Sequence, residues 1–349
     1  MAKASTDPSD SDRIEGFLHP REAMALLGQD DALGRSARAI RSGRPPSAWL
    51  ITGAPGIGKA TLAYRIARYL LAYGATDAGA QDLSVPPDHP AARQVAAASH
   101  PGLLVLKRAV NPKTGKLMSV LSVDEIRKLA GFFGMTSGAG GWRVAIVDTA
   151  DDMNDNAANA LLKMLEEPPA NAMLLLLSHA PGRLLPTIRS RCQRLELRPL
   201  DDAILEKMLA RELPEMNTAE RAALARVAGG SIGAALTLAT GDGAALAQEA
   251  DRLIDNAREP DLLALLGLGE KLFRMRDGLE QFGEFLMASL SDRIRAKAHA
   301  GATGLERWVA ALGRIEQSFG RAVALNLEPR QVVLSTARDL SKVARSGTL

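Results

Sequence analysis

The sequence predicts an α/β fold up to Pro199: a parallel five-stranded sheet with helices on both faces, followed by purely helical parts. Two observations indicate it. Short apolar runs alternate with helical patterns as far as Pro199, which is typical of a parallel α/β sheet. Four of the five candidate strands are nearly all apolar, as strands buried on both faces should be. Beyond Pro199 only helical patterns follow.

The strands are expected at Ala48–Thr52, Gly102–Leu106, Arg143–Val147, Ala172–Ser178 and Gln193–Leu197. The last strand alternates leucine with charge, which places it near an edge of the sheet. Helices are expected over Lys59–Tyr73, Ser122 to about Phe133, Asp155–Glu167, Asp201–Arg211 and Ala219–Ala228. The Ser122–Glu125 spacing predicts a capping box. Turns are expected at Asn111–Lys116, as the tip of a hairpin, and at Ser137–Gly141.

The length of 349 residues is sufficient for two or three domains. A polar, acidic tail is expected over residues 1–14, because it lacks the apolar residues that a core needs. The α/β domain is expected over residues 15–198, a small helical lid over 199–245, and a larger helical domain over 246–349. The amphipathic helices of this last domain must bury their apolar faces, either within the chain or against a partner.

The composition narrows the function classes. Lys and Arg exceed Asp and Glu by 43 to 40, which is too small an excess to indicate a nucleic-acid partner by itself. Aromatic residues are 4%, which argues against a base-stacking single-strand binder. The single cysteine, Cys192, excludes an internal disulfide and a multi-cysteine zinc site, and it favours a reducing, cytoplasmic location. The sequence has no signal-peptide-like or membrane-spanning apolar run.

The strongest motif is the glycine-rich run Gly53–Thr61, between an apolar strand and a helix. This context is that of a phosphate-binding P-loop, in which Gly53, Gly56 and Gly58 let backbone N–H groups wrap phosphates and Lys59 supplies charge. The alternative is a turn that only joins strand to helix. The residue after the lysine is Ala60, which has no oxygen for Mg²⁺, and Thr61 lies about 100° further round the helix. Metal-assisted hydrolysis is therefore compromised.

Asp148 ends the apolar strand Arg143–Val147, as in a Walker B pattern, and could orient metal-bound water. The alternative is an aspartate that caps the next turn. The following residue is Thr149, where an ATPase would need a carboxylate base. Asp151 and Asp152 are expected to cap the segment that follows.

Arg189 and Arg191 follow the fourth strand and are expected near the carboxyl edge of the sheet, where they suit contact with an anion. The alternatives are a surface role or an ion pair within the chain, and spacing alone favours these.

The sequence resembles bacterial clamp-loader subunits of the AAA+ family, in the delta-prime group of DNA polymerase III. The matching stretches are Gly56–Ala67, Ser122–Leu129, Asn156–Pro169 and Arg183–Cys192. The resemblance covers about Trp49 to Arg198 and is weaker beyond, where it depends on Gly230-Ser231 and on Asn326–Pro329.

The resemblance implies that Arg191 is an arginine finger, which acts in trans on ATP held by a neighbouring subunit. It places Ser178 at the position of sensor 1, facing the phosphates, and Gly233 where the arginine of sensor 2 would stand. Three positions then lack the side chain that catalysis needs, at Ala60, Thr149 and Gly233. The resemblance therefore implies a subunit that does not hydrolyse ATP efficiently, is not an enzyme on its own, and binds ATP at most weakly.

Other implications concern partners. The resemblance implies the motor (gamma/tau) and delta subunits as neighbours, with the sliding clamp and primed DNA reached through the complex. It implies that the last helices form an oligomerising collar. Relatives carry a four-cysteine zinc module where Ala75–His100 stands here; this stretch has no cysteine, so we expect an irregular loop without zinc. His100 is expected to be structural. Lys113 and Lys116 are expected to be solvated, and no DNA contact is assigned.

Two other functions are consistent with the P-loop. The chain could be an ATP-hydrolysing AAA+ motor subunit, which turnover by the purified chain would reveal. It could also be a P-loop nucleotide kinase, which would need a substrate pocket and a lid arginine, and no such cluster is evident in the sequence.

Overall fold

A computed structural model describes residues 14, 16–110, 118, 120–134, 141–275, 278–325 and 327–345. The chain divides into two compact units, Met1–Ile204 and Leu205–Leu349, which we call the α/β unit and the helical unit. The further division into a lid and a collar stays a prediction. The predicted tip at 111–116, almost all of the predicted tail and loop 137–141, and Asn326 lie outside the described residues.

The predicted fold class is confirmed in the described part of the chain, where a parallel five-stranded sheet has the order β2-β3-β4-β1-β5. The strands are β1 (Ala48–Thr52), β2 (Leu103–Leu106), β3 (Arg143–Val147), β4 (Ala172–Ser178) and β5 (Gln193–Glu196). The expected edge position of β5 is confirmed. The other edge strand is β2, which is only partly buried, so its apolar run did not distinguish it from the central strands.

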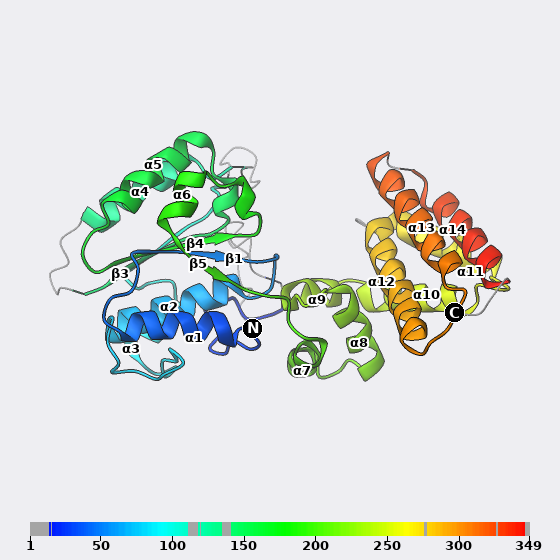
Figure 1. The fold of residues 1–349 in the computed structure, drawn as a ribbon, viewed down its shortest axis with the longest axis horizontal. Coiled ribbons are helices and arrows are strands. Elements are labelled where there is room, and N and C mark those ends of the chain that lie inside the picture. The colour runs from blue at the N-terminus through cyan, green and yellow to red at the C-terminus, as the bar shows by residue number, and fades with distance from the viewer. Residues whose placement is uncertain are drawn as a thin grey trace. The chain divides into compact units, whose positions relative to one another are not determined.

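Helices cover both faces of the sheet (Figure 1). They are α1 (Asp30–Arg41), α2 (Lys59–Tyr73), α3 (Pro90–Ala96), α4 (Val123–Gly134), α5 (Asp155–Glu166) and α6 (Pro186–Arg191). The side chains of each strand alternate between two cores. Trp49 and Ile51 of β1 pack on the side of α1, α2 and α3, whereas Leu50 packs on the side of α4, α5 and α6.

Two predictions about local structure were wrong. The stretch Ala75–His100 is not wholly irregular, because it contains α3, whose first turn is capped by the His89 ring, the acceptor for the Ala91 N–H at 3.2 Å. The capping box at α4 is only half formed: the Glu125 N–H lies 3.4 Å from the Ser122 hydroxyl, while the Glu125 carboxylate pairs with Lys128 at 2.6 Å. The local charge pair on the helix surface replaces the second half of the box.

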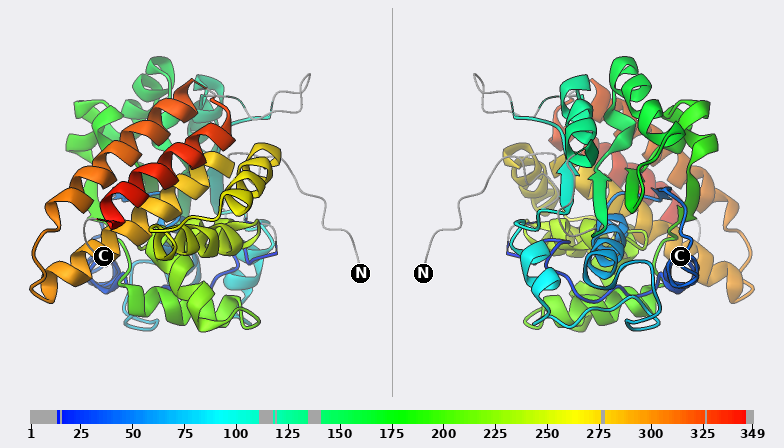
Figure 2. Two further views of the ribbon diagram at one scale, coloured as in Figure 1. Left: turned by 90° about the vertical axis from the view of Figure 1, so that its right-hand side faces the viewer. Right: turned by 90° about the vertical axis from the view of Figure 1, so that its left-hand side faces the viewer.

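In its described residues the helical unit is built from helices, which range from 8 residues in α9 to 22 in α12 (Figure 2). The helices after β5 are α7 (Asp202–Glu212), α8 (Thr218–Val227), α9 (Ile232–Ala239), α10 (Gly243–Asp255), α11 (Leu262–Arg274), α12 (Gly278–His299), α13 (Glu306–Ala324) and α14 (Pro329–Ala344). Asp251 of α10 joins three helices, because it pairs with Arg226 of α8 and with Ser289 and Arg293 of α12.

Some apolar side chains of this unit lie on the surface, and several of them belong to α11. Val332 and Val333 of α14 and Leu265 of α11 are buried, as intramolecular packing requires. In contrast, Leu263 and Phe273 of α11 are 81% and 71% exposed, and Leu262 and Leu266 are exposed as well. Val309 of α13 is also exposed, at 55%.

Candidate nucleotide-binding site

The loop between β1 and α2 requires its glycines. Gly53, Gly56 and Gly58 have φ of 148°, 72° and 103°, a region that other residues rarely adopt. A Cβ on Gly53 would lie 2.4 Å from the Ile57 side chain and 2.8 Å from the Leu197 carbonyl oxygen. The loop therefore has the backbone that the P-loop interpretation predicts, and it leads directly into the N-terminus of α2.

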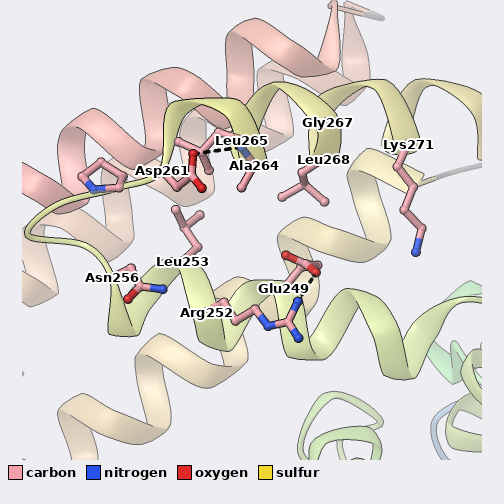
Figure 3. A pocket seen from close by; sticks show the side chains of 11 residues that line it. Glu249, Arg252, Leu253, Asn256, Asp261, Ala264, Leu265, Gly267, Leu268 and Lys271 are labelled. Carbon is pink, nitrogen blue, oxygen red and sulfur yellow. Dashed lines mark hydrogen bonds and ion pairs between the residues drawn. The ribbon is translucent and has the colours of Figure 1, made fainter.

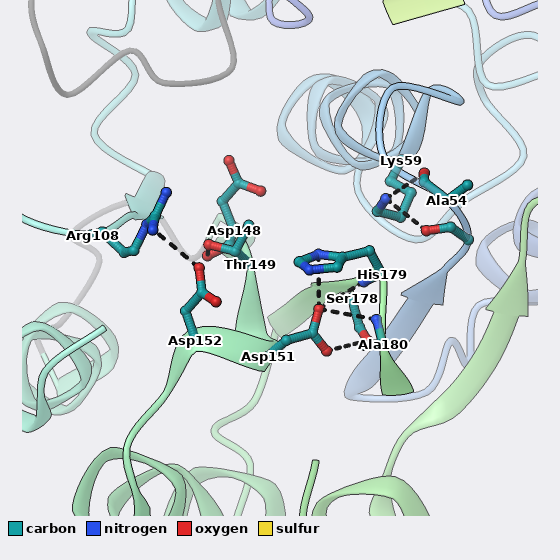
Figure 4. Close-up of polar contacts among 11 residues, drawn as sticks. Ala54, Lys59, Arg108, Asp148, Thr149, Asp151, Asp152, Ser178, His179 and Ala180 are labelled. Atoms are coloured by element: carbon teal, nitrogen blue, oxygen red, sulfur yellow. Dashed lines mark hydrogen bonds and ion pairs between the residues drawn. The ribbon is translucent and has the colours of Figure 1, made fainter. Parts of the chain in front are cut away.

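The charge of Lys59 lies inside this loop. Its Nζ donates hydrogen bonds to the carbonyl oxygens of Gly53 and Ala54, both at 2.8 Å (Figure 4). Burial lowers the pKa of Lys59, while attraction by Asp148 and Asp151 acts in the opposite direction. The negative charges of Asp148 and Asp151 therefore lie close enough to the loop to attract the Lys59 ammonium group. Ala60, next along α2, packs against the core and offers no oxygen to a metal.

The predicted site residues around this loop meet because parallel strands end at one edge. Thr52 of β1 is in register with Ser178 of β4, and β3 ends beside them before Asp148. Thr61 is half-buried one position past Ala60. Gly53, Gly56, Gly58, Lys59, Asp148 and Ser178 thus gather at the carboxyl edge of the sheet.

Thr149, which replaces the expected carboxylate base, is held locally. It adopts the left-handed conformation, with φ 52° and ψ 59°, and its hydroxyl donates to the carbonyl oxygen of Asp148 at 2.8 Å. A hydroxyl that is engaged with its own backbone cannot activate water as a carboxylate would.

Asp151 is not a cap, as the sequence had suggested, but the centre of a buried network. Its carboxylate accepts hydrogen bonds from the Ser178 hydroxyl at 2.5 Å and from the backbone N–H groups of His179 and Ala180 at 2.7 and 3.2 Å. The Nδ1 atom of His179 lies 3.0 Å from the same carboxylate. Asp152 pairs instead with Arg108 at 3.4 Å. The network joins the turn after β3 to the end of β4.

The network also determines where Ser178 points. The side chain is fully buried, and its hydroxyl donates to Asp151. The hydroxyl proton of Ser178 is therefore engaged by a carboxylate, and its role as sensor 1 stays a prediction. An aspartate a few residues beyond one strand and a Ser-His pair ending the neighbouring strand are the sequence signal that could have revealed this contact.

Gln29 is a second residue that sequence reasoning missed. It is almost fully buried, and its amide donates to the carbonyl oxygens of Ile57 and Arg198 at 3.3 and 2.8 Å, while its oxygen accepts from the Arg198 N–H at 3.2 Å. The hydrogen bonds of Gln29 therefore connect the P-loop to the segment that follows β5. A lone glutamine ahead of a helix carries no motif, so only the fold reveals this contact.

Arg191 lies at the opposite edge of the sheet, and the prediction that placed it near the carboxyl edge was wrong. After β4 the chain must return to the amino edge before β5 can run parallel, and α6 makes this return. Arg191 ends α6 just before Gln193, which pairs with Trp49 at the start of β1. A five-residue strand spans about 16 Å, so Arg191 lies roughly that far from its own P-loop.

The guanidinium of Arg191 has partners within the chain. One nitrogen lies 2.9 Å from a carboxylate oxygen of Glu166, at the end of α5, and another donates to the Thr187 carbonyl oxygen at 3.1 Å. The side chains of Arg191 and Glu166 are 37% and 50% exposed. An exposed pair of this kind contributes about 0–1 kcal/mol.

Gly233 lies in the first turn of α9, where Ser231 caps the helix by accepting a hydrogen bond from the Ala234 N–H at 3.1 Å. Glycine brings no side chain to the position of the second sensor.

The described residues include no cluster of three or more histidine, cysteine or acidic side chains that could hold a metal. His100 accepts a hydrogen bond from the Gly102 N–H at 3.0 Å, and burial lowers its pKa. Its structural role was expected.

A cavity of about 430 Å³ lies in the helical unit between α10 and α11 (Figure 3). Leucine side chains such as Leu253 and Leu268 form its walls. Among its charged lining residues, Arg252 pairs with Glu249 at 2.7 Å, Lys271 pairs with Asp242 at 3.5 Å, and Asp261 accepts hydrogen bonds from the N–H groups of Leu263 and Ala264. We assign no ligand to it.

The thiol of Cys192 should resist modification in the native protein. Burial raises the pKa of Cys192 to about 12, so the reactive thiolate is scarce at neutral pH. We expect iodoacetamide to leave native protein unmodified and to label it fully in urea, as mass spectrometry would show. Rapid labelling of the native chain would contradict the burial of this thiol.

Within the described ranges, no helix combines the length and apolar character needed to cross a membrane.

Solved structures resemble the chain only loosely. A gamma-subunit-related protein of DNA polymerase III from Thermotoga maritima is 20% identical, with a TM-score of 0.40 over 90% of this chain and 99% of that one. The Thermotoga maritima RuvB Holliday junction branch migration motor is 19% identical, with a TM-score of 0.43 over 84% of this chain and 86% of that one.

The sequence relatives belong to a narrower group of proteins than the solved structures. The DNA polymerase III subunit delta' of Pseudomonas aeruginosa is 40% identical over 53% of each chain, and that of Escherichia coli is 36% identical over 58% of each chain. The subunit tau of Salmonella typhimurium is 26% identical over 95% of this chain and 49% of its own. The alignments thus span about half the length of these curated relatives. Residues 28–201 match the family described as "DNA polymerase III, delta subunit", and the chain belongs to this family.

Proposed function

We propose that the chain is a clamp-loader subunit of DNA polymerase III that does not hydrolyse ATP efficiently and supplies Arg191 in trans to a neighbouring motor subunit. The family match and the delta' and tau relatives support the clamp-loader role. The motor (gamma/tau) and delta subunits are the proposed neighbours. The sliding clamp and primed DNA are reached through the complex, and the proposed location is the cytoplasm.

The position of Arg191 is the observation that carries the proposal. Its guanidinium lies at the amino edge of the sheet, about a strand length from the P-loop of its own chain. Arg191 is therefore poorly placed for phosphates bound there but suited to those of an adjoining molecule. Releasing it from Glu166 costs little, since exposed ion pairs contribute about 0–1 kcal/mol. A fixed guanidinium can then stabilise charge that develops on a γ-phosphoryl group.

The loss of hydrolysis follows from the chain's own site. Ala60 offers no metal ligand, the Thr149 hydroxyl is engaged with its own backbone, and Gly233 has no side chain. The P-loop glycines and Lys59 remain, so we propose weak nucleotide binding that function does not require. Zinc is not part of the proposal, because residues 75–100 contain no cysteine.

The alternative is an ATP-hydrolysing motor subunit, which similarity to tau over most of the chain favours. The steady-state ATPase rate of the purified full chain separates the two. The proposed function expects no turnover above background. Turnover at a motor-like rate that disappears in Lys59→Ala would establish the alternative. The arginine finger is tested separately, by the ATPase rate of a reconstituted assembly that carries Arg191→Ala.

Lys59→Ala should change clamp loading by the assembly less than about twofold, because Ala60 has already removed the metal ligand that hydrolysis needs. The measurement is the rate of clamp loading onto primed DNA. The matched control is the P-loop lysine of the motor subunit, whose loss should abolish loading. A severe defect from Lys59→Ala would mean that this site is used.

A further inference from the structure

A histidine that the sequence motifs did not include lies beside the P-loop. His179 follows β4, and its ring lies on the side of the Asp151 carboxylate that faces Lys59 (Figure 4). The ring is reached from solvent, since the side chain is 34% exposed, whereas the Asp151 side chain is completely buried. His179 is thus an accessible ionisable group at the mouth of the site that the P-loop forms.

Asp151 determines how this imidazole is presented. The carboxylate is held by the Ser178 hydroxyl and by the backbone N–H groups of His179 and Ala180, so it cannot turn away. It lies 3.0 Å from Nδ1 of His179, and within the described residues Nε2 has no hydrogen-bond partner. A carboxylate that binds one ring nitrogen fixes the tautomer and directs the other nitrogen outward. The free Nε2 is therefore available to a ligand.

The charge of the site suggests what that ligand is. The phosphates of a nucleotide bring several negative charges, which a P-loop normally offsets with lysine and a protein-held Mg²⁺. Here Ala60 removes the metal ligand, so the protein must supply positive charge by other means. Lys59 is one source, and an imidazolium at His179 would be the second.

We propose that His179, oriented by Asp151, contacts the terminal phosphate of a nucleoside diphosphate or triphosphate through Nε2 and replaces the charge of the missing metal. The proposal rests on the nucleotide-binding part of the proposed function but not on the arginine finger. It makes this P-loop a site for nucleotide without protein-held metal.

The charged groups around His179 determine how its contact with phosphate should depend on pH. Asp151, from the turn after β3, places a carboxylate 3.0 Å from Nδ1 of His179, and Lys59 of α2 lies on the other side of the ring (Figure 4). A bound phosphate would add negative charge beside Nε2. With Nδ1–H directed at Asp151, Nε2 can donate to a phosphate oxygen only when the ring is an imidazolium, so the contribution of His179 to affinity should be larger at lower pH.

Fluorescent mant-ADP titrated into the full chain tests this contact. We compare wild type with His179→Gln at about pH 6 and pH 8, with EDTA present or absent. The ratio of wild-type to variant affinity should rise about tenfold from the higher to the lower pH, the size of one charge-assisted hydrogen bond. EDTA should leave both affinities unchanged. The phosphate's own titration is common to both proteins and cancels in the ratio.

His299→Gln is the matched control, because this histidine is exposed at the end of α12 in the other unit, and it should bind as wild type does. Circular dichroism confirms that each variant is folded. As a measurement that needs no variant, the Nε2 resonance of His179 in wild-type protein should shift on addition of ADP.

Equal affinity ratios at both pH values, a requirement for Mg²⁺, a silent Nε2 resonance, or no binding of mant-ADP to wild type would each overturn the proposal. None of these results would contradict the proposed arginine finger, which is tested separately by the rate of ATP hydrolysis at a neighbouring subunit.

Discussion

If Arg191 is the proposed arginine finger, Arg191→Ala will lower hydrolysis at the neighbouring site by about 10³-fold or more, the range of arginine fingers supplied in trans. The effect is large because the guanidinium stabilises charge that exists only in the transition state, so its loss lowers the rate rather than the affinity for ATP. The measurement is ATP hydrolysis by the reconstituted assembly, together with the rate of clamp loading.

Arg189→Ala is the matched control, since Arg189 is exposed on the same short helix, α6, and should leave the rate unchanged. Size-exclusion chromatography should show intact assembly for both variants, because the pair between Arg191 and Glu166 contributes little to stability. An unchanged hydrolysis rate for Arg191→Ala would mean that this residue only forms a surface ion pair.

Asp151→Ala will lower the free energy of unfolding of the α/β unit by about 3–5 kcal/mol. The change leaves the Ser178 hydroxyl and the N–H groups of His179 and Ala180 without their acceptor. A buried donor that loses its partner costs about 1–3 kcal/mol, and the costs of neighbouring donors partly overlap. Urea denaturation followed by circular dichroism measures the loss.

The adjacent Asp152→Ala provides the comparison, because Asp152 pairs with Arg108 at 3.4 Å in a partly exposed position and should cost below about 1 kcal/mol. Asp151→Asn, which keeps one acceptor oxygen, should fall between the two. Equal midpoints for Asp151→Ala and Asp152→Ala would show that the buried network does not stabilise the sheet edge.

Regular elements were well predicted where a pattern repeats. The apolar runs located all five described strands to within a residue at each end, and the period of α2 gave its bounds. Short helices such as α3 and α6 have too few turns for a period to emerge. The edge strand β2 was not distinguished from the central strands, because its run is as apolar as theirs although it is only partly buried.

The candidate site was predictable only in part, for a related reason. Glycines and a lysine in fixed spacing identify a P-loop, because the geometry is local. The contact of Asp151 with Ser178 and the bridge from Gln29 to Arg198 join residues far apart in the chain. Arg191 was placed at the wrong edge because its position depends on the direction in which α6 crosses the sheet, which spacing alone does not give.

The separation of Arg191 from the P-loop also has a consequence for symmetry. If one edge of the sheet donates a cation and the opposite edge receives phosphate, two copies related by a twofold axis cannot satisfy both contacts through a single shared patch. Contacts of this type are head-to-tail, and they generate a ring or an open row of subunits. A chain whose phosphate-binding edge no longer supports hydrolysis can still donate its arginine to a neighbour, so it can occupy the end of such a row.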